Sequence, residues 1–312
     1  MSASSPAFLA APAGSGRTAA VRLAAGNLLL GTLGVFIVES GQGAVTVAFY
    51  RCLVGAVAMA LYCRVAGVPV LTGLDRRGLA LAVLTGALMA GNWVLFAGAV
   101  VHIGIALATI VFHVQPFLVV LLGALVFGER LTPARLAWVA LAFAGLLAAI
   151  GVPGAGPEIL SSGEAYGWGI ACALGGAFLY AWVTLLARRL TAVKGPALTL
   201  LQCLVGVPLL ALLGPTAPTA LGDAWPWLAG IGLVHTGLVY ALIYGALPGL
   251  ATPVIAVLTF LYPASAVLVD GLMYGHFVDL AQAGGLVLIV AAGLGVTLGR
   301  SPLRPSLPRP SR

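Results

Sequence analysis

The sequence predicts an all-α membrane protein with ten transmembrane helices, built as two inverted repeats of five helices, with both termini in the cytoplasm. Three observations predict this fold class. Apolar residues make up 61% of the 312 residues and charged residues only 7%, one segment of the first half recurs in the second, and Lys and Arg gather in alternate loops. A water-soluble chain could not cover so much apolar surface with so little charge. We therefore expect a multi-pass protein of the cell membrane.

Ten segments are apolar over about 20 residues, the length that crosses a bilayer. Charges and Gly or Pro clusters bound them, and they cover residues 20–39, 45–66, 78–99, 104–127, 133–151, 166–187, 196–214, 226–247, 251–273 and 280–299. The predicted domains are a flexible cytoplasmic N-terminus (1–19), a first five-helix repeat (20–151), a periplasmic or extracellular loop (152–165), a second five-helix repeat (166–299) and a disordered cytoplasmic tail (300–312).

Lys and Arg orient the bundle, because loops rich in these residues stay in the cytoplasm. With the N-terminus inside, 14 of the 15 Lys and Arg residues fall in cytoplasmic segments, and the exception, Arg51, lies within the second span. The outer loops contain only acidic charges, namely Glu39, Glu158, Glu164, Asp223 and Asp279. A wrong number of helices would hardly leave the two signs so well separated.

Residues 116–129 and 263–276 are similar to each other and lie 147 residues apart. Pro116 aligns with Pro263, and Gly128 aligns with Gly275. Because each repeat has an odd number of helices, the second must enter the membrane in the opposite orientation. Proline has no N–H, so we expect a kink in each helix near the middle of the membrane. The carbonyls freed one turn earlier could bind a cationic group.

Several residues carry a resemblance to a known family. Pro116 is followed by the helix end GERL at residues 128–131, Arg51 lies early in the second span, and Gly145 and Gly293 lie in the final helix of each half. In these features the chain resembles the EamA-domain branch of the drug/metabolite transporter superfamily over nearly all of residues 20–299. It differs in carrying His276 where the family often has Glu, and in lacking the Trp-Gly pair usual in the first span.

The resemblance implies a secondary active transporter of a small organic solute, working by alternating access. It favours an exporter of an amino acid or related metabolite, with proton antiport as an energy source. Efflux of drugs or toxic compounds and flipping of a lipid-linked carrier are alternatives on the same fold. The expected partners are a small-molecule substrate and the lipid bilayer, with protons and a homodimer left open, and no nucleic acid.

A membrane-embedded enzyme is a less favoured alternative, because such an enzyme needs a dense set of catalytic groups. The four histidines are scattered through the chain, without HxxxH or HExxH spacing, at positions 102, 113, 235 and 276. There is also no Walker lysine for an ATP-driven pump. We therefore expect no catalytic residue, no metal site and no cofactor.

Polar side chains repeat on one face of several spans, which predicts a substrate cavity between the two halves. The candidate cavity residues are Asn92, Thr109, His113, Pro116, Thr236, Tyr240, Tyr244, Thr259 and Pro263. The alternative is structural: Asn92 would link two helices, His113 would pack, and the prolines would only kink their helices.

Three charged residues are candidates for coupling and gating. Asp270 is the only carboxylate well inside an apolar span, where it could take up and release a proton. The alternative places Asp270 close enough to the outer surface to stay hydrated. Glu39 and Arg51 could form an ion pair that closes an outer gate. The alternative for that pair is a solvated glutamate and a snorkelling arginine.

Overall fold

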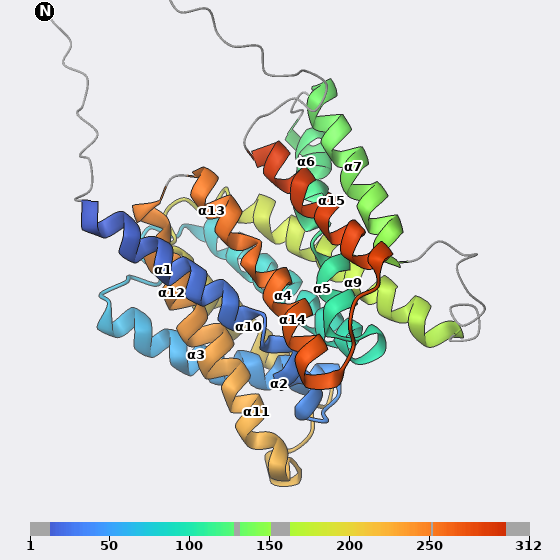
Figure 1. The fold of residues 1–312 in the computed structure, drawn as a ribbon. Coiled ribbons are helices and arrows are strands. Elements are labelled where there is room, and N and C mark those ends of the chain that lie inside the picture. The colour runs from blue at the N-terminus through green and yellow to red at the C-terminus, as the bar shows by residue number, and fades with distance from the viewer. Residues whose placement is uncertain (1–12, 128–131, 151–162, 251, 298–312) are drawn as a thin grey trace, which may run out of the picture.

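The computed structural model describes residues 13–127, 132–150, 163–250 and 252–297, and every regular element in these ranges is helical (Figure 1). The helices are α1 (Ala13–Leu30), α2 (Leu33–Glu39), α3 (Ala44–Val65), α4 (Arg76–Ile103), α5 (Ile105–Phe112), α6 (Gln115–Phe127), α7 (Pro133–Ile150), α9 (Gly163–Ala187), α10 (Gly195–Ala211), α11 (Trp225–Gly230), the π-helix η3 (Ile231–Leu238), α12 (Val239–Ala246), α13 (Thr252–Thr259), α14 (Leu261–Tyr274) and α15 (Leu280–Thr297). Short 3-10 turns cover Pro218–Ala220 (η1), Gly222–Ala224 (η2) and Leu247–Gly249 (η4). The all-α class is thus confirmed.

Seven helical segments within the described residues are long and apolar enough to cross a membrane. They are Gly16–Glu39, Ala44–Val65, Arg76–Ile103, Ile105–Val126, Gly163–Ala187, Gly222–Gly249 and Val257–Tyr274. The other three expected segments contain shorter apolar helices, Pro133–Ala149, Gly195–Ala211 and Leu280–Gly295. Three predicted features lie outside the described residues: the helix end at Gly128 and Glu129, the loop that contains Glu158, and the tail of residues 300–312.

Two helical segments are interrupted at matching positions of the repeat. α5 ends at Phe112 and α6 begins at Gln115, directly before Pro116, while Phe260 separates α13 from α14, three residues before Pro263. Proline cannot donate to the carbonyl four residues earlier, so the helix loses a hydrogen bond at that point. The predicted interruption near each proline is therefore confirmed.

Contacts between helices follow the repeat. α3 packs against α10 and α7 against α15, and each of these pairs joins corresponding helices of the two halves. Two further sets of contacts are matched: α4 packs on α9 as α1 packs on α12, and α4 packs on α10 as α3 packs on η3. Such reciprocal pairing is what a two-fold relation between the halves produces. Figure 1 shows α7 and α15 side by side, and α1 beside α12.

The backbones of α7 and α15 approach each other closely at two glycines. A Cβ atom added to Gly145 would lie 2.7 Å from the carbonyl oxygen of Gly285, and one added to Gly285 would lie 2.8 Å from the amide nitrogen of Ala149. Only a residue without a side chain fits at such a distance, as is common between helices in membranes. These two glycines therefore set how closely the last helices of the halves approach.

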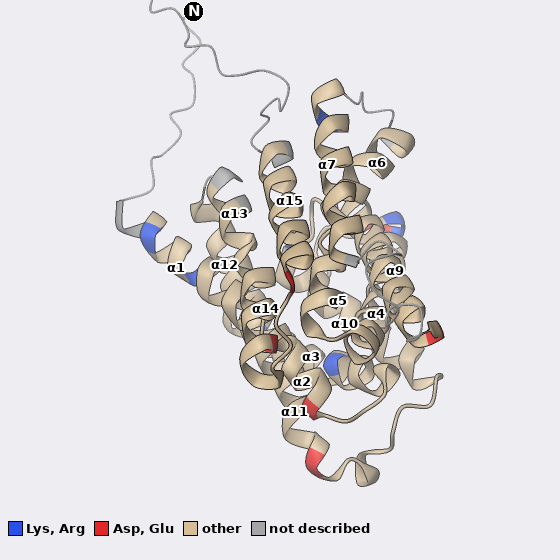
Figure 2. Cartoon of the chain, turned by 45° about the vertical axis from the view of Figure 1, so that its right-hand side comes forward, with Lys and Arg blue, Asp and Glu red and all other residues tan. Residues whose placement is uncertain are grey.

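The two ends of the bundle differ in charge. Figure 2 shows Asp and Glu near α2 and α11, and Lys and Arg near α1 and α7. α2, α4 and α14 all finish at the acidic end, which is called the Asp270 end below. α1 and α13 begin, and α12 finishes, at the opposite end.

Candidate functional site: a cavity between the two halves

A cavity of about 530 Å³ lies between the two halves. The first half contributes residues of α1 to α6, and the second contributes residues of α9 and α12 to α15. Much of the wall is aromatic, formed by Trp93, Phe96, Phe112, Tyr180, Tyr240, Tyr244, Phe260 and Tyr262. The polar side chains of the lining are those of Asn27, Arg51, Asn92, His113, Gln115 and Thr259, together with the tyrosine hydroxyl groups. The cavity can therefore surround an organic molecule and offer it a few polar groups.

The structure brings six of the nine predicted cavity residues to this lining, namely Asn92, His113, Pro116, Tyr240, Tyr244 and Thr259. Thr109, Thr236 and Pro263 are buried away from it. For Thr236 the reason is local. It lies in the π-helix, where its hydroxyl donates to the carbonyl of Ile231, five residues earlier, at 3.3 Å. The helical period assumed for that face does not hold there.

Asn92 and His113 both line the cavity and contact neighbouring parts of the fold, so they combine the cavity role and the structural role considered from the sequence. The Nδ2 atom of Asn92 donates to the carbonyl of Gly176 at 2.8 Å, and this bond links α4 to α9. The ring of His113 lies 5.1 Å from that of Tyr262, and its Nδ1 is 2.6 Å from the carbonyl oxygen of Thr109. Both residues line the cavity as well. Their positions are thus held by the fold while one side faces the cavity.

Arg51 reaches the cavity from α3 and is buried, with 5% of its surface exposed. Its Nε donates to the hydroxyl of Thr236 at 3.1 Å, and its guanidinium carbon lies 4.6 Å from the centre of the Trp93 ring. The predicted ion pair with Glu39 is not formed in this structure. Glu39 instead accepts a hydrogen bond from the hydroxyl of Tyr274 at 2.7 Å. In this structure each residue has other partners: Arg51 lies in the cavity lining, and Glu39 contacts the last residue of α14.

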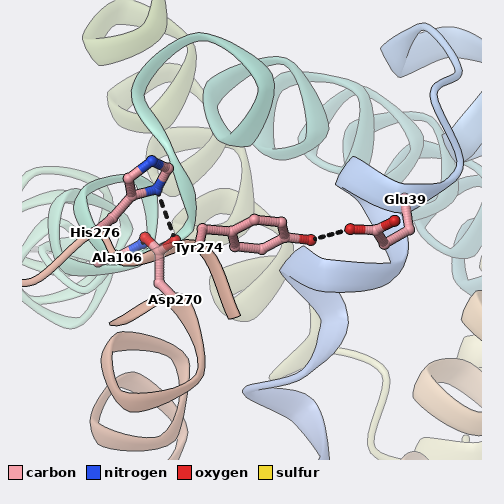
Figure 3. A network of polar contacts seen from close by, with 5 residues as sticks. All are labelled: Glu39, Ala106, Asp270, Tyr274 and His276. Carbon is pink, nitrogen blue, oxygen red and sulfur yellow. Dashed lines mark hydrogen bonds and ion pairs between the residues drawn. The ribbon is translucent and has the colours of Figure 1, made fainter. Parts of the chain in front are cut away.

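Asp270 is buried beneath the Asp270 end, with 2% of its surface exposed, which favours the buried carboxylate over the hydrated alternative. Figure 3 shows its contacts: Oδ2 accepts from the backbone N–H of Ala106 at 2.7 Å, and Oδ1 lies 3.1 Å from Nδ1 of His276. Ala106 is the second residue of α5, whose first amides have no partner within the helix. Asp270 therefore caps a helix of the other half.

The backbone around this cap is shaped by Gly104. It separates α4 from α5 with a φ of +76°, a conformation that side chains disfavour. A Cβ atom there would lie 3.7 Å from Oδ2 of Asp270. The turn lets the N-terminus of α5 point at the carboxylate of α14.

Two amide side chains of the lining are not among the residues predicted from the sequence. Asn27 donates from Nδ2 to the carbonyl of Leu23 at 2.9 Å, and Gln115 donates from Nε2 to the hydroxyl of Thr184 at 3.3 Å. Both are amides inside apolar segments, which is a signal that could have found them. His235 is also buried but does not line the cavity, and its Nε2 lies 3.0 Å from the hydroxyl of Thr32.

A bundle of apolar helices in two similar halves, with a cavity lined by residues of both halves, defines a multi-pass membrane transporter. The model of the EamA-like transporter family matches residues 18–151 and 167–298. The chain belongs to this family and is a transporter of the cell membrane. The family points to transport rather than to an enzymatic reaction.

The relatives agree with this assignment. The uncharacterized transporter YxxF of Bacillus subtilis is 28% identical over 286 residues, which cover 91% of this chain and 90% of the relative. The pseudopaline exporter CntI of Pseudomonas aeruginosa is 35% identical over 98 residues, 31% of this chain and 33% of the exporter. A solved crystal structure with 22% identity has a TM-score of 0.62 and covers 90% of this chain and 97% of its own. That likeness concerns the fold alone.

Proposed function

We propose that the protein is a secondary active transporter that carries a small organic solute across the cell membrane by alternating access. The observation that carries this proposal is the cavity lined by residues of both repeats. Its volume of about 530 Å³ lies within the usual range for small-molecule sites. Movement of one half against the other would expose such a cavity first to one side and then to the other.

In the proposed arrangement ten helices cross the membrane, both termini are cytoplasmic, and the second half is inverted. The seven long helices and the three shorter apolar ones support this number, and the matched helix contacts support the two-fold relation. The separation of acidic and basic residues in Figure 2 supports the orientation. The Asp270 end would then face outward.

The contacts at the Asp270 end act in this proposal as the outer gate. The bonds from Ala106 to Asp270 and from Tyr274 to Glu39 join α5 and α2 of the first half to α14 of the second. At the opposite end, the lining of the cavity reaches Leu247, between α12 and α13. The structure would thus represent a state closed to the outside, with its cavity directed toward the cytoplasm.

Export of an amino acid or a related metabolite is the proposed activity. The segment shared with the pseudopaline exporter supports the direction of transport. The test is counterflow in liposomes that contain the purified protein, with radiolabelled amino acids as probes. Saturable exchange that requires the protein supports the proposal, and the absence of saturable exchange for every amino acid contradicts the proposed solute.

Two cavity residues give a prediction for this assay. Asn92→Ala and His113→Ala should each raise the apparent KM for exchange several-fold, since both side chains line the cavity. Leu272→Ala is the control, because Leu272 is 71% exposed and outside the lining. If both variants keep the apparent KM of the wild type, the assignment of the cavity as the substrate site is wrong.

Asp270 is the proposed coupling residue. Uptake of a proton would remove the charge that faces the N–H of Ala106 and the ring of His276, and would loosen the contact between the halves. Asp270→Asn should therefore abolish the acceleration of flux by an imposed pH gradient and spare counterflow, which needs no net proton movement. Asp223→Asn, an exposed acidic residue outside this network, should respond to the gradient like the wild type. An unchanged response in Asp270→Asn would exclude the coupling role.

A further inference from the structure

The cavity has an unbalanced charge. Among the described residues of its lining, Arg51 is the only Lys, Arg, Asp or Glu. Glu39 and Asp270 do not line the cavity. Glu39 contacts Tyr274, and Asp270 contacts Ala106 and His276. Burying a charge without a partner is costly. The cavity lining therefore carries a fixed positive charge that a bound anion would neutralise.

The guanidinium group of Arg51 is held in place but not saturated. It has five N–H donors, and among the described residues its only hydrogen bond runs from Nε to Thr236. The π-helix places the hydroxyl of Thr236, and the ring of Trp93 supports the guanidinium plane. The terminal nitrogens have no hydrogen-bond partner in the described part of the chain. They are the two adjacent donor atoms that bind both oxygens of a carboxylate.

The cavity that Arg51 lines has a largely aromatic wall. Trp93, Phe96, Phe112 and Tyr180 line the same cavity, and Phe112 lies 5.2 Å from Phe96 and 5.9 Å from Tyr180 between ring centres. Such a wall packs well against an aromatic or aliphatic body. A single arginine balances one negative charge, so a monocarboxylate fits better than a phosphate, which would keep part of its second charge uncompensated in an apolar site.

We propose that Arg51 binds the carboxylate of the transported solute, and that the aromatic wall binds an apolar body attached to it. This inference rests on the proposed transport function and adds a substrate class to it: small organic monocarboxylates. Thr236 is in this scheme a positioning residue, which fixes the direction of the guanidinium without touching the solute.

The test measures binding to the purified full-length protein by thermal shift and calorimetry. The probes are matched sets of three molecules with one apolar body, for example 3-phenylpropionate, 3-phenylpropionamide and 3-phenylpropylamine, with bodies of several sizes. The carboxylate should stabilise the protein in at least one set, while its amide and amine do not. Arg51→Gln should weaken carboxylate binding about 10-fold to 100-fold, the effect of losing a charge-assisted pair. The carboxylate affinity of Arg51→Lys should lie between those of the wild type and Arg51→Gln, because the charge remains and the bidentate geometry is lost.

Other outcomes overturn the inference. It fails if no carboxylate outperforms its amide and amine, or if Arg51→Gln binds the carboxylate as tightly as the wild type. Thr236→Val keeps the charge of Arg51, and it is the variant to measure if Arg51→Gln does not fold. It should weaken carboxylate binding and leave the preference over the amide in place, and an unchanged affinity would exclude the positioning role.

Counterflow separates this inference from the proposed function. Exchange of an amine or amide without exchange of any carboxylate would preserve transport and overturn the role of Arg51. Carboxylate binding that depends on Arg51 but never leads to exchange would preserve the binding site and overturn the transport function.

Discussion

Asp270→Ala should lower the thermal stability of the purified protein and open the Asp270 end. The substitution leaves the N–H of Ala106 without its acceptor at a site where Ala106 is 5% exposed. An unsatisfied buried donor costs about 1–3 kcal/mol. The start of α5 should then lose protection, so amide exchange at Ile105–Phe112 should accelerate more than elsewhere in the bundle.

Two variants make this measurement specific. Asp270→Asn keeps an oxygen acceptor and should recover part of the lost stability. Asp223→Ala removes an exposed acidic residue near the same end and should melt within about 0.5 kcal/mol of the wild type. If Asp270→Ala melts like Asp223→Ala, the cap on α5 does not contribute to stability.

Gly285→Val should be the most damaging substitution at the contact between α7 and α15. A Cβ at this position would meet backbone atoms of α7, among them the amide nitrogen of Ala149 at 2.8 Å. These backbone atoms cannot move away by a rotamer change, as the end of a flexible side chain can. The helices must separate, and the free energy of unfolding should fall by about 1–3 kcal/mol or more, as is typical of overpacking.

Gly284 provides a matched control on the same helix. A Cβ at Gly284 meets no atom within 4 Å, so Gly284→Val shares the change in helix propensity without the clash. Melting of the two purified variants should separate these effects. Equal melting temperatures would show that α7 and α15 do not pack through Gly285.

Local features of the fold could be predicted from the sequence. The loss of a backbone donor at Pro116 and Pro263 is a property of one residue, so the interruptions before both prolines could be expected. The apolar content similarly indicates helices, since a helix satisfies its own backbone groups in lipid. The contact of Gly145 with Gly285 could not be inferred, because it depends on how two distant helices meet.

The site was predictable only where helical period applies. Asn92, His113 and Tyr240 lie on regular faces or at the end of one, and they reached the cavity lining. Thr236 did not, because the π-helix changes the angle between successive residues. The hydrogen bond between Tyr274 and Glu39 joins residues of two distant helices, so it depends on how these helices pack and cannot be inferred from spacing along one helix.

The matched interruptions of α5–α6 and α13–α14 have a consequence for how the opposite state can arise. The two halves contain the same joint, at His113 and at Phe260. Under alternating access, the outward-open form would require no new fold, because the helix segments on either side of each joint could reorient as intact units. Duplication of a five-helix unit in opposite orientations would then have given each half its own joint for this movement.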